Sequence, residues 1–159
     1  MQDRPEYRFA CDAMLKGLAR WLRAYGYDAS WTYGIDDQVL LEQARREGRI
    51  VLTADGGILR LRSVRRGDPP GWKVGHEKPP LQQLQDLVKE LGLARKAIRC
   101  MGCGGELKRV PKQSVREEAP PRTFAWLDEF YRCLACGQLF WPGTHYRRIQ
   151  QQLKFLELE

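Results

Sequence analysis

The sequence contains no long hydrophobic run. No apolar stretch approaches the roughly 18 to 20 residues that cross a bilayer as a helix. The first nine residues, MQDRPEYRF, lack the apolar segment of a secretory signal peptide. Low-complexity tracts and internal repeats are also missing, apart from two similar cysteine pairs. These absences argue against a membrane-spanning or secreted protein, and we expect a cytoplasmic one.

Acidic residues are in the minority. The 159 residues include 20 aspartates and glutamates against 27 lysines and arginines, which gives a formal net charge of +7. A basic excess suits a polyanionic partner such as nucleic acid, although it also serves solubility. With 43% hydrophobic residues, the chain has enough apolar material for the core of one ordinary domain or two small ones.

Short apolar runs alternate with helical patterns in the first part of the chain. Such alternation is typical of parallel strands with helices on their faces. We therefore predict an α/β domain with a mostly parallel sheet over residues 1–95. The expected strands cover residues 7–11, 27–33, 49–53 and 71–75, and the expected helices cover residues 13–26, 37–48, 58–67 and 79–92.

The cysteines are paired rather than scattered. Cys100 and Cys103 form one Cys-x-x-Cys pair, and Cys133 and Cys136 form another. A glycine follows each second cysteine and permits the tight turn that aims backbone N–H groups at zinc-bound thiolates. In a cytosolic chain, such pairs indicate a metal site or a redox centre. Since neither pair lies beside a βαβ unit, structural Zn²⁺ is favoured. We expect the fifth cysteine, Cys11, to be a small core residue.

The second domain is expected to be a small zinc ribbon followed by a helix, over residues 96–159. The 29 residues between Cys103 and Cys133 exceed the usual spacing, so a long hairpin or loop should join the two pairs. Within that connection, residues 111–122, PKQSVREEAPPR, are expected to form a mobile loop. The last helix should carry an apolar stripe made of Ile149, Leu153 and Leu156.

Aspartates follow three of the expected strands. Asp12 comes after the first strand, Asp36 and Asp37 after the second, and Asp55 after the third. In parallel α/β sheets, side chains beyond the carboxyl ends of the strands converge on one crevice. Carboxylates gathered there repel one another unless a cation such as Mg²⁺ or Mn²⁺ lies between them. The alternative is that each aspartate only caps the helix that follows it.

Basic residues lie on one face of the first helix. Lys16, Arg20 and Arg23 fall within about 60° of one another at helical periodicity. This face is either simply solvated or binds the phosphates of RNA beside Asp12. Near the C-terminus, Arg147 and Arg148 are further candidates for RNA contact.

Aromatic residues gather around the second cysteine pair. Two interpretations remain open for them: stacking on unpaired bases, or packing that covers a small ribbon and docks it on its neighbour. The residues concerned are Trp126, Tyr131, Phe140, Trp141 and Tyr146.

Taken together, these segments resemble the Mut-seven C-terminal ribonuclease family. The resemblance rests on CDAMLKGLARWLRAYGYDA, on DDQVLLEQARREGRIVLTAD, on LQQLQDLVKELGL, on the cysteine pairs and on FWPGTHY. It implies a PIN-like three-layer α/β/α domain, a zinc ribbon, and hydrolysis of RNA with a divalent metal. The family's acidic positions match Asp12, Asp37 and Asp55, with Asp36 as the adjacent second choice. The chain departs from the family in having Gly56 and Gly57 after the third acid.

The function expected from the sequence is therefore that of a metal-dependent ribonuclease, with Mg²⁺ or Mn²⁺ at the acidic site and structural Zn²⁺ in the ribbon. A non-catalytic module that binds RNA or protein is the main alternative, because no clear fourth acid follows the fourth strand, in GHEKPP. A metal-free ribonuclease that uses His76 and His145 is a more distant one.

Overall fold

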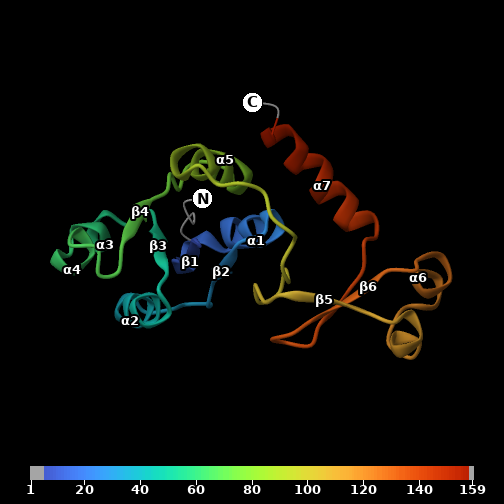
Figure 1. The fold of residues 1–159 in the computed structure, drawn as a ribbon. Coiled ribbons are helices and arrows are strands. Elements are labelled where there is room, and N and C mark those ends of the chain that lie inside the picture. Colours follow the sequence, from blue (N-terminus) through green and yellow to red (C-terminus); the bar gives the residue numbers. More distant parts are fainter. Residues whose placement is uncertain (1–5, 158–159) are drawn as a thin grey trace, which may run out of the picture.

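The computed structural model describes residues 6–157, which form two separate sheets (Figure 1). The first sheet has four parallel strands in the order β2-β1-β3-β4. Its strands are β1 (Arg8–Cys11), β2 (Asp28–Ser30), β3 (Ile50–Thr53) and β4 (Gly71–Lys73). The predicted parallel α/β domain is confirmed. The second strand is shorter than expected, because the chain leaves the sheet at Trp31, whose indole N–H donates to the carbonyl of Ala13 at 2.9 Å.

Helices cover both faces of this sheet and give the three α/β/α layers. Side chains of β1 alternate between the layers: Phe9 and Cys11 belong to one buried cluster, and Ala10 belongs to the other. The first layer contains the 3₁₀ turn η1 (Ala13–Leu15), α1 (Lys16–Tyr25) and α5 (Pro80–Leu91). The second layer contains α2 (Asp37–Glu47), α3 (Gly56–Arg60) and α4 (Arg62–Arg65).

Helices α1 and α5 approach each other closely at Gly17. A Cβ atom at this position would lie 2.5 Å from Cγ of Pro80, so only glycine permits this contact without a shift of the backbone. The close approach fixes the start of α1, which is the part of the helix that carries Lys16 and Arg20.

The expected helix over residues 58–67 is wrong in one respect, because it is broken at Leu61. That residue has extended dihedral angles, φ −59° and ψ 137°, and separates α3 from α4. Ile58 and Val64 are both buried in the α2 layer. In an unbroken helix, side chains six residues apart would point about 120° away from each other, so the break lets both face the sheet.

The second sheet is antiparallel and forms the ribbon. Its strands are β5 (Leu107–Val110), β6 (Phe130–Cys133) and β7 (Leu139–Phe140). Between β5 and β6, the chain forms the 3₁₀ turn η2 (Lys112–Val115) and the helix α6 (Pro121–Trp126). The expected loop over residues 111–122 therefore contains helical turns, while its mobility stays a prediction. Val115 is fully buried and packs in a small core with Phe130.

The last helix, α7 (Thr144–Glu157), returns to the first domain. Ile149 and Leu153 are buried in the same cluster as the apolar residues of α1 and α5, and Leu156 packs against it. The predicted apolar stripe is confirmed. Figure 1 shows α7 beside the layer that holds α1 and α5, far from the outer turns of the ribbon. Within residues 6–157, no helix is long and apolar enough to cross a membrane.

Candidate functional site

Three strands of the parallel sheet deliver aspartates to one end. Strand β1 lies between β2 and β3, so Asp12 at its carboxyl end lies between the acids that follow its neighbours. Asp36 and Asp37 lie beyond β2, and Asp55 lies beyond β3. The chain passes from β1 to β2 on one side of β1 and then crosses to β3 on the other side of β1. Ligands of open α/β sheets bind at such a reversal of strand order.

Asp12 is the most firmly held of these acids. Its side chain is 5% exposed, and both oxygens accept hydrogen bonds. The backbone N–H of Ala13 donates to Oδ1 at 2.8 Å, and the hydroxyl of Thr53 donates to Oδ2 at 2.7 Å. The same Thr53 oxygen accepts from the backbone N–H of Asp55 at 2.9 Å. Thr53 therefore joins two of the acidic positions, a role that the sequence analysis missed.

Asp36 and Asp55 both cap helices. Oδ1 of Asp36 accepts from the N–H of Gln38 at 2.9 Å, and Oδ1 of Asp55 accepts from the N–H of Gly57 at 2.7 Å. Both carboxylates are exposed. A cap uses a single oxygen, and in the described part of the chain the second oxygen of Asp55 accepts no hydrogen bond. Capping and metal binding are thus compatible at Asp55, and they do not exclude each other.

Asp37 lies in the first turn of α2 and is affected by the other acids. Partial desolvation raises the pKa of its carboxyl, and the negative charges of Asp12, Asp55 and Asp36 raise it further. Asp37 therefore lies near enough to each of the other three carboxylates for their charges to act on it. The charge is concentrated where divalent cations would be attracted, because such cations prefer carboxylate oxygens.

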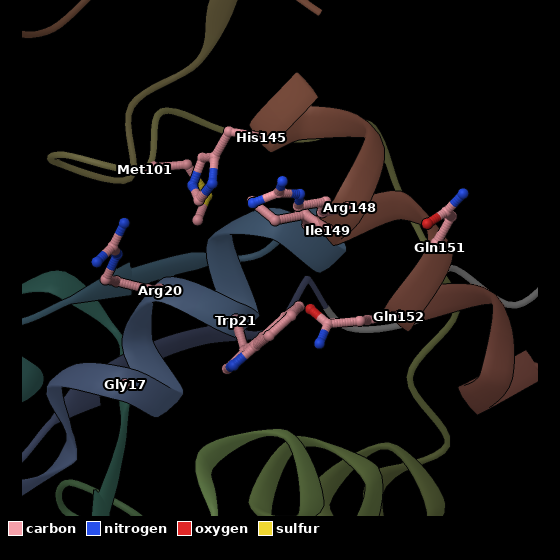
Figure 2. Close-up of a pocket in the computed structure, with 9 residues that line it drawn as sticks. All are labelled: Gly17, Arg20, Trp21, Met101, His145, Arg148, Ile149, Gln151 and Gln152. Carbon is pink, nitrogen blue, oxygen red and sulfur yellow. The ribbon is translucent and has the colours of Figure 1, made fainter. Parts of the chain in front are cut away.

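Two of the predicted basic residues, Lys16 and Arg20, lie on the exposed side of α1, which begins four residues after Asp12. The ammonium group of Lys16 lies 5.2 Å from the centre of the Trp31 ring, and Trp31 in turn is bound to Ala13. Arg20 is exposed one turn further along. It lines a groove between α1 and α7, together with Arg148 (Figure 2). Arg147 is also exposed, but it does not line this groove.

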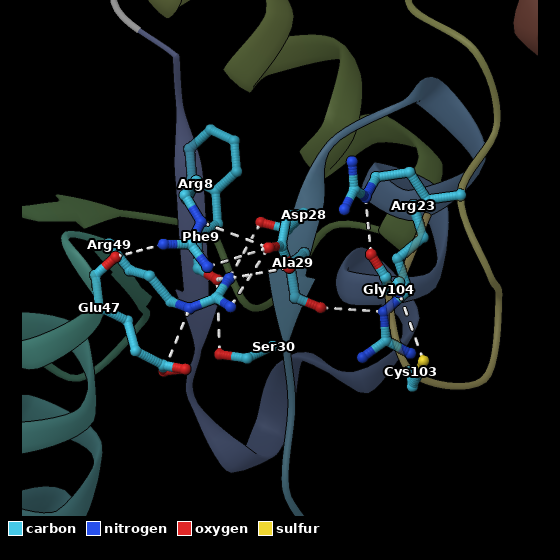
Figure 3. Close-up of polar contacts among 12 residues, drawn as sticks. Arg8, Phe9, Arg23, Asp28, Ala29, Ser30, Glu47, Arg49, Cys103 and Gly104 are labelled. Carbon is cyan, nitrogen blue, oxygen red and sulfur yellow. Dashed lines mark hydrogen bonds and ion pairs between the residues drawn. The ribbon is translucent and has the colours of Figure 1, made fainter. Parts of the chain in front are cut away.

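Arg23 does not share this exposed face, and that expectation is wrong. Its side chain is 5% exposed. Its Nε donates to the carbonyl of Ala29 at 2.9 Å (Figure 3), and its Nη1 donates to the carbonyl of Met101 at 2.9 Å. Desolvation by this burial lowers the pKa of its guanidinium. Arg23 therefore ties the first cysteine pair to the parallel sheet, because Met101 follows Cys100.

A second buried arginine lies at the amino end of the sheet, away from the acids. Arg49 is 6% exposed and contacts both carboxylate oxygens of Asp28, with the Nη1–Oδ1 distance at 3.0 Å. Arg8 donates to Oδ2 of Asp28 at 3.2 Å (Figure 3). Burial alone would raise the pKa of Asp28, but the hydrogen bonds and charges of the arginines outweigh it and lower that pKa. This network fixes the strands rather than forming part of the acidic site.

The four paired cysteines lie close together. Their sulfur atoms fall within 4.8 Å of one another. Within residues 6–157 they are the only group of three or more potential ligands close enough together to hold a metal ion, so the aspartate oxygens do not form such a group in this arrangement. The sulfurs of Cys100 and Cys136 are 3.7 Å apart, and those of Cys103 and Cys133 are 3.5 Å apart. Zn–S bonds of about 2.3 Å in a tetrahedron place neighbouring sulfurs about 3.8 Å apart. The arrangement therefore fits zinc.

Backbone N–H groups point toward these sulfurs. Gly105 donates to the sulfur of Cys103 at 3.3 Å, and Cys136 donates to the sulfur of Cys133 at 3.5 Å. The turn at Gly104 needs a φ of +83°, which glycine adopts without strain. Burial would raise the pKa of the Cys133 thiol, but the backbone N–H groups of Cys136 and Ala135 and the neighbouring thiols lower it, whereas burial raises the pKa of Cys100 and of Cys103. These donors favour the thiolate, which is the form that binds metal.

Cys11 and the aromatic residues serve packing. Cys11 is 1% exposed in the core, and burial raises its pKa to about 12, so it is an unreactive thiol. Most of the aromatic rings of the ribbon contact one another. The ring centroids of Phe130 and Trp141 are 6.5 Å apart, and those of Phe140 and Tyr146 are 5.7 Å apart. Trp126 is the exception, with 84% of its surface exposed.

Comparison with known proteins gives one family and one relative. The sequence matches the model of the Mut7-C RNAse domain family over residues 7–153. It is also 47% identical, over 58 residues, to a human protein (Homo sapiens) named exonuclease mut-7 homolog. That segment is 36% of this chain and 7% of the relative, so the similarity covers a small part of the longer protein. No solved structure matches the chain.

Proposed function

The chain belongs to the Mut7-C RNAse domain family, and we propose that it is a metal-dependent ribonuclease. The family's name and the exonuclease name of the human relative both support a nuclease. The proposal rests on the placement of three acids: Asp12 directly follows β1, Asp55 lies two residues beyond β3, and Asp37 opens helix α2 after β2, near enough to the other two for their charges to raise its pKa.

The proposed ligands of Mg²⁺ or Mn²⁺ are Asp12, Asp37 and Asp55. Asp36 is the second choice to Asp37, since one of its oxygens is already used to cap α2. The raised pKa of Asp37 supports the fit, because the repulsion that causes it is the kind that a bound cation relieves. A divalent cation held there would stabilise negative charge on a phosphate and lower the pKa of a water molecule.

The residues of the chain have separate tasks in this proposal. Thr53 holds the Asp12 carboxylate in one orientation and, through the backbone of Asp55, sets the distance between the two acids. Lys16 and Arg20 bind the phosphates of the substrate from the exposed side of α1. Arg148 does so from α7 across the groove, and Arg147 adds positive charge nearby.

The four cysteines are proposed to hold one structural Zn²⁺. A tetrahedral site with four thiolates leaves no position for water, so the role of the metal is folding and not catalysis. The ribbon is small, and its own core contains few buried side chains. Zinc would therefore stabilise the strands β5 and β6 and the loop that Arg23 binds. Thiols kept free for metal also fit the reducing cytoplasm, which is the proposed compartment.

The test is cleavage of a mixed-sequence RNA pool under controlled metal conditions. The protein is treated briefly with EDTA, and elemental analysis confirms that zinc is retained. Cleavage should stop without added metal and return with Mg²⁺ or Mn²⁺. Full cleavage in EDTA would contradict the role given to the aspartates.

A non-catalytic RNA-binding module is the second candidate. The favouring observation is that β4 is followed by Val74, Gly75 and His76, so no aspartate at its carboxyl end joins the others. In that case the RNA pool would be bound but not cleaved with either metal. A metal-free ribonuclease that uses His76 and His145 has less support. His76 pairs with Glu77 after β4, at 3.6 Å, whereas His145 lies on α7.

A further inference from the structure

An open groove separates α1 from α7 and has a volume of about 580 Å³. Arg20 and Trp21 line it from α1, His145 and Arg148 line it from α7, and Met101 lines it from the cysteine loop. Figure 2 shows these side chains converging on one hollow from three separate segments. The volume falls within the range of roughly 300–1,000 Å³ that holds small organic ligands, so there is room for a nucleotide unit.

The groove continues toward the acidic site. A second hollow of about 290 Å³ shares Arg20 and Met101 with the first and is also lined by Lys16 and Trp31. The indole of Trp31 is bound to the carbonyl of Ala13, which directly follows Asp12. The two hollows adjoin at Arg20 and Met101 and together form a track that runs from α7 to Trp31, which is hydrogen-bonded to the segment that carries Asp12.

The charge on the walls of this track is of one sign. Arg20 and Arg148 face the same space from different helices, and in residues 6–157 neither has a carboxylate partner. Two like charges on facing walls repel each other, and an anion between them removes that cost. Lys16 extends the positive charge along the track. Simple helix packing does not require these groups, because Ile149 and Leu153 already attach α7 to the core.

We propose that the groove between α1 and α7 binds single-stranded RNA that flanks the cleaved phosphate, with an unstacked base against Trp21. This rests on the proposed function and names its substrate class. Arginines on both walls bind successive phosphates, while the half-buried Trp21 ring offers a surface on which any base can stack. A duplex keeps its bases paired and stacked, so it cannot supply a base to this groove. The C-terminal helix is therefore one wall of the substrate track, in addition to its role in packing.

The test measures binding of a fluorescent single-stranded 12-mer and of the corresponding duplex, without Mg²⁺ or Mn²⁺ so that both stay intact. Arg148→Glu should weaken binding of the single strand at least tenfold at moderate salt and reduce the salt slope by about 1. Trp21→Leu should weaken it about tenfold, the loss of one stacked base. Lys154→Glu is the matched control, since it makes a charge reversal on the exposed surface of the same helix without lining the groove.

Cross-linking provides a second readout that does not depend on affinity. A single strand that contains 4-thiouridine should cross-link to peptides that carry Trp21, Met101 or His145. Thermal unfolding of each variant checks that Trp21→Leu still folds. If it does not, Arg148→Glu and the cross-links still decide the matter.

The possible outcomes separate this inference from the proposed function. Equal affinities of Arg148→Glu and Lys154→Glu for the single strand would contradict RNA binding in the groove, even if the wild type cleaves RNA. Equal binding of duplex and single strand would contradict it as well. Conversely, binding of the single strand in the groove without cleavage in either metal would contradict the proposed ribonuclease activity and support RNA binding in the groove.

Discussion

Thr53 donates its hydroxyl hydrogen to the buried carboxylate of Asp12 over 2.7 Å, and its oxygen accepts the backbone N–H of Asp55. This threonine is fully buried at the end of β3. It links the acid on the central strand to the acid on the neighbouring strand. A rigid link of this kind is what a metal site needs, because ligating carboxylates bind with the right geometry only when other groups hold them.

Replacing Thr53 with valine keeps its shape and removes the hydroxyl. We expect Thr53→Val to lower the free energy of unfolding by about 1–3 kcal/mol, since a buried carboxylate oxygen loses its donor. RNA cleavage should fall about tenfold or more while the affinity for RNA stays near that of the wild type. Chemical denaturation and single-turnover cleavage measure the two effects. Thr53→Ser keeps the hydroxyl and should recover most of the activity; a serine variant as impaired as the valine variant would contradict this role.

The network around Asp28 predicts a pH dependence of stability. Because the two arginines lower the pKa of Asp28 in the folded chain, its ionisation stabilises the fold above about pH 4, the ordinary value in unfolded chains. That contribution is lost as the pH falls through the lowered pKa. Asp28→Asn should therefore cost about 2 kcal/mol at pH 7 and much less at pH 3. Urea denaturation at both pH values is the measurement, and a cost independent of pH would argue against the assigned ionisation.

Zinc content tests the cysteine cluster. Protein purified without added metal should contain about one zinc per chain by elemental analysis, because four thiolates complete a tetrahedron. Cys133→Ser should lose most of this zinc and unfold the ribbon at a lower denaturant concentration. The matched control is Cys11→Ala, which removes the remaining cysteine from the core and should keep the metal. A wild-type protein with an intact ribbon and almost no zinc would contradict the assignment.

The buried hydrogen bonds of Arg23 predict an effect on stability. Lysine cannot reach the carbonyls of Ala29 and Met101 together, so Arg23→Lys should cost about 2 kcal/mol. The same substitution at the exposed Arg20 should change stability by about 0.5 kcal/mol or less. Thermal and chemical denaturation of the two variants compare them directly. Equal stabilities would show that the buried contacts of Arg23 contribute little.

The sequence was sufficient for the features that depend on periodicity and spacing. The alternation of strands and helices predicts the parallel sheet, and the stripe of Ile149 and Leu153 predicts the apolar face of α7. The spacing of the cysteines predicts a cluster, because Cys-x-x-Cys turns are local structures.

Features that depend on contacts distant in sequence were not predicted correctly. Arg23 occupies a basic face by helical periodicity, yet the cysteine loop folds over it and buries it. Residues 111–122 are rich in proline and charge, but Val115 finds an apolar partner in Phe130. The hydroxyl of Thr53 meets Asp12 only because β3 pairs with β1. The available local signal was the position of Thr53, which ends β3 two residues before Asp55.

The most direct test of the acidic site is the cleavage rate of Asp55→Asn at saturating Mg²⁺ and at saturating Mn²⁺. Asparagine caps a helix about as well as aspartate, so the N–H of Gly57 keeps its acceptor and stability should change by about 0.5 kcal/mol or less. Asp86→Asn is the control for loss of a carboxylate elsewhere, because Asp86 lies in the middle of α5 and pairs with Lys78. Asp55→Asn should fold normally and cleave RNA at least about a hundredfold more slowly than the wild type, whereas Asp86→Asn should cleave at a rate near that of the wild type. Cleavage by Asp55→Asn at the wild-type rate in both metals would reduce Asp55 to a helix cap and contradict the proposed active site.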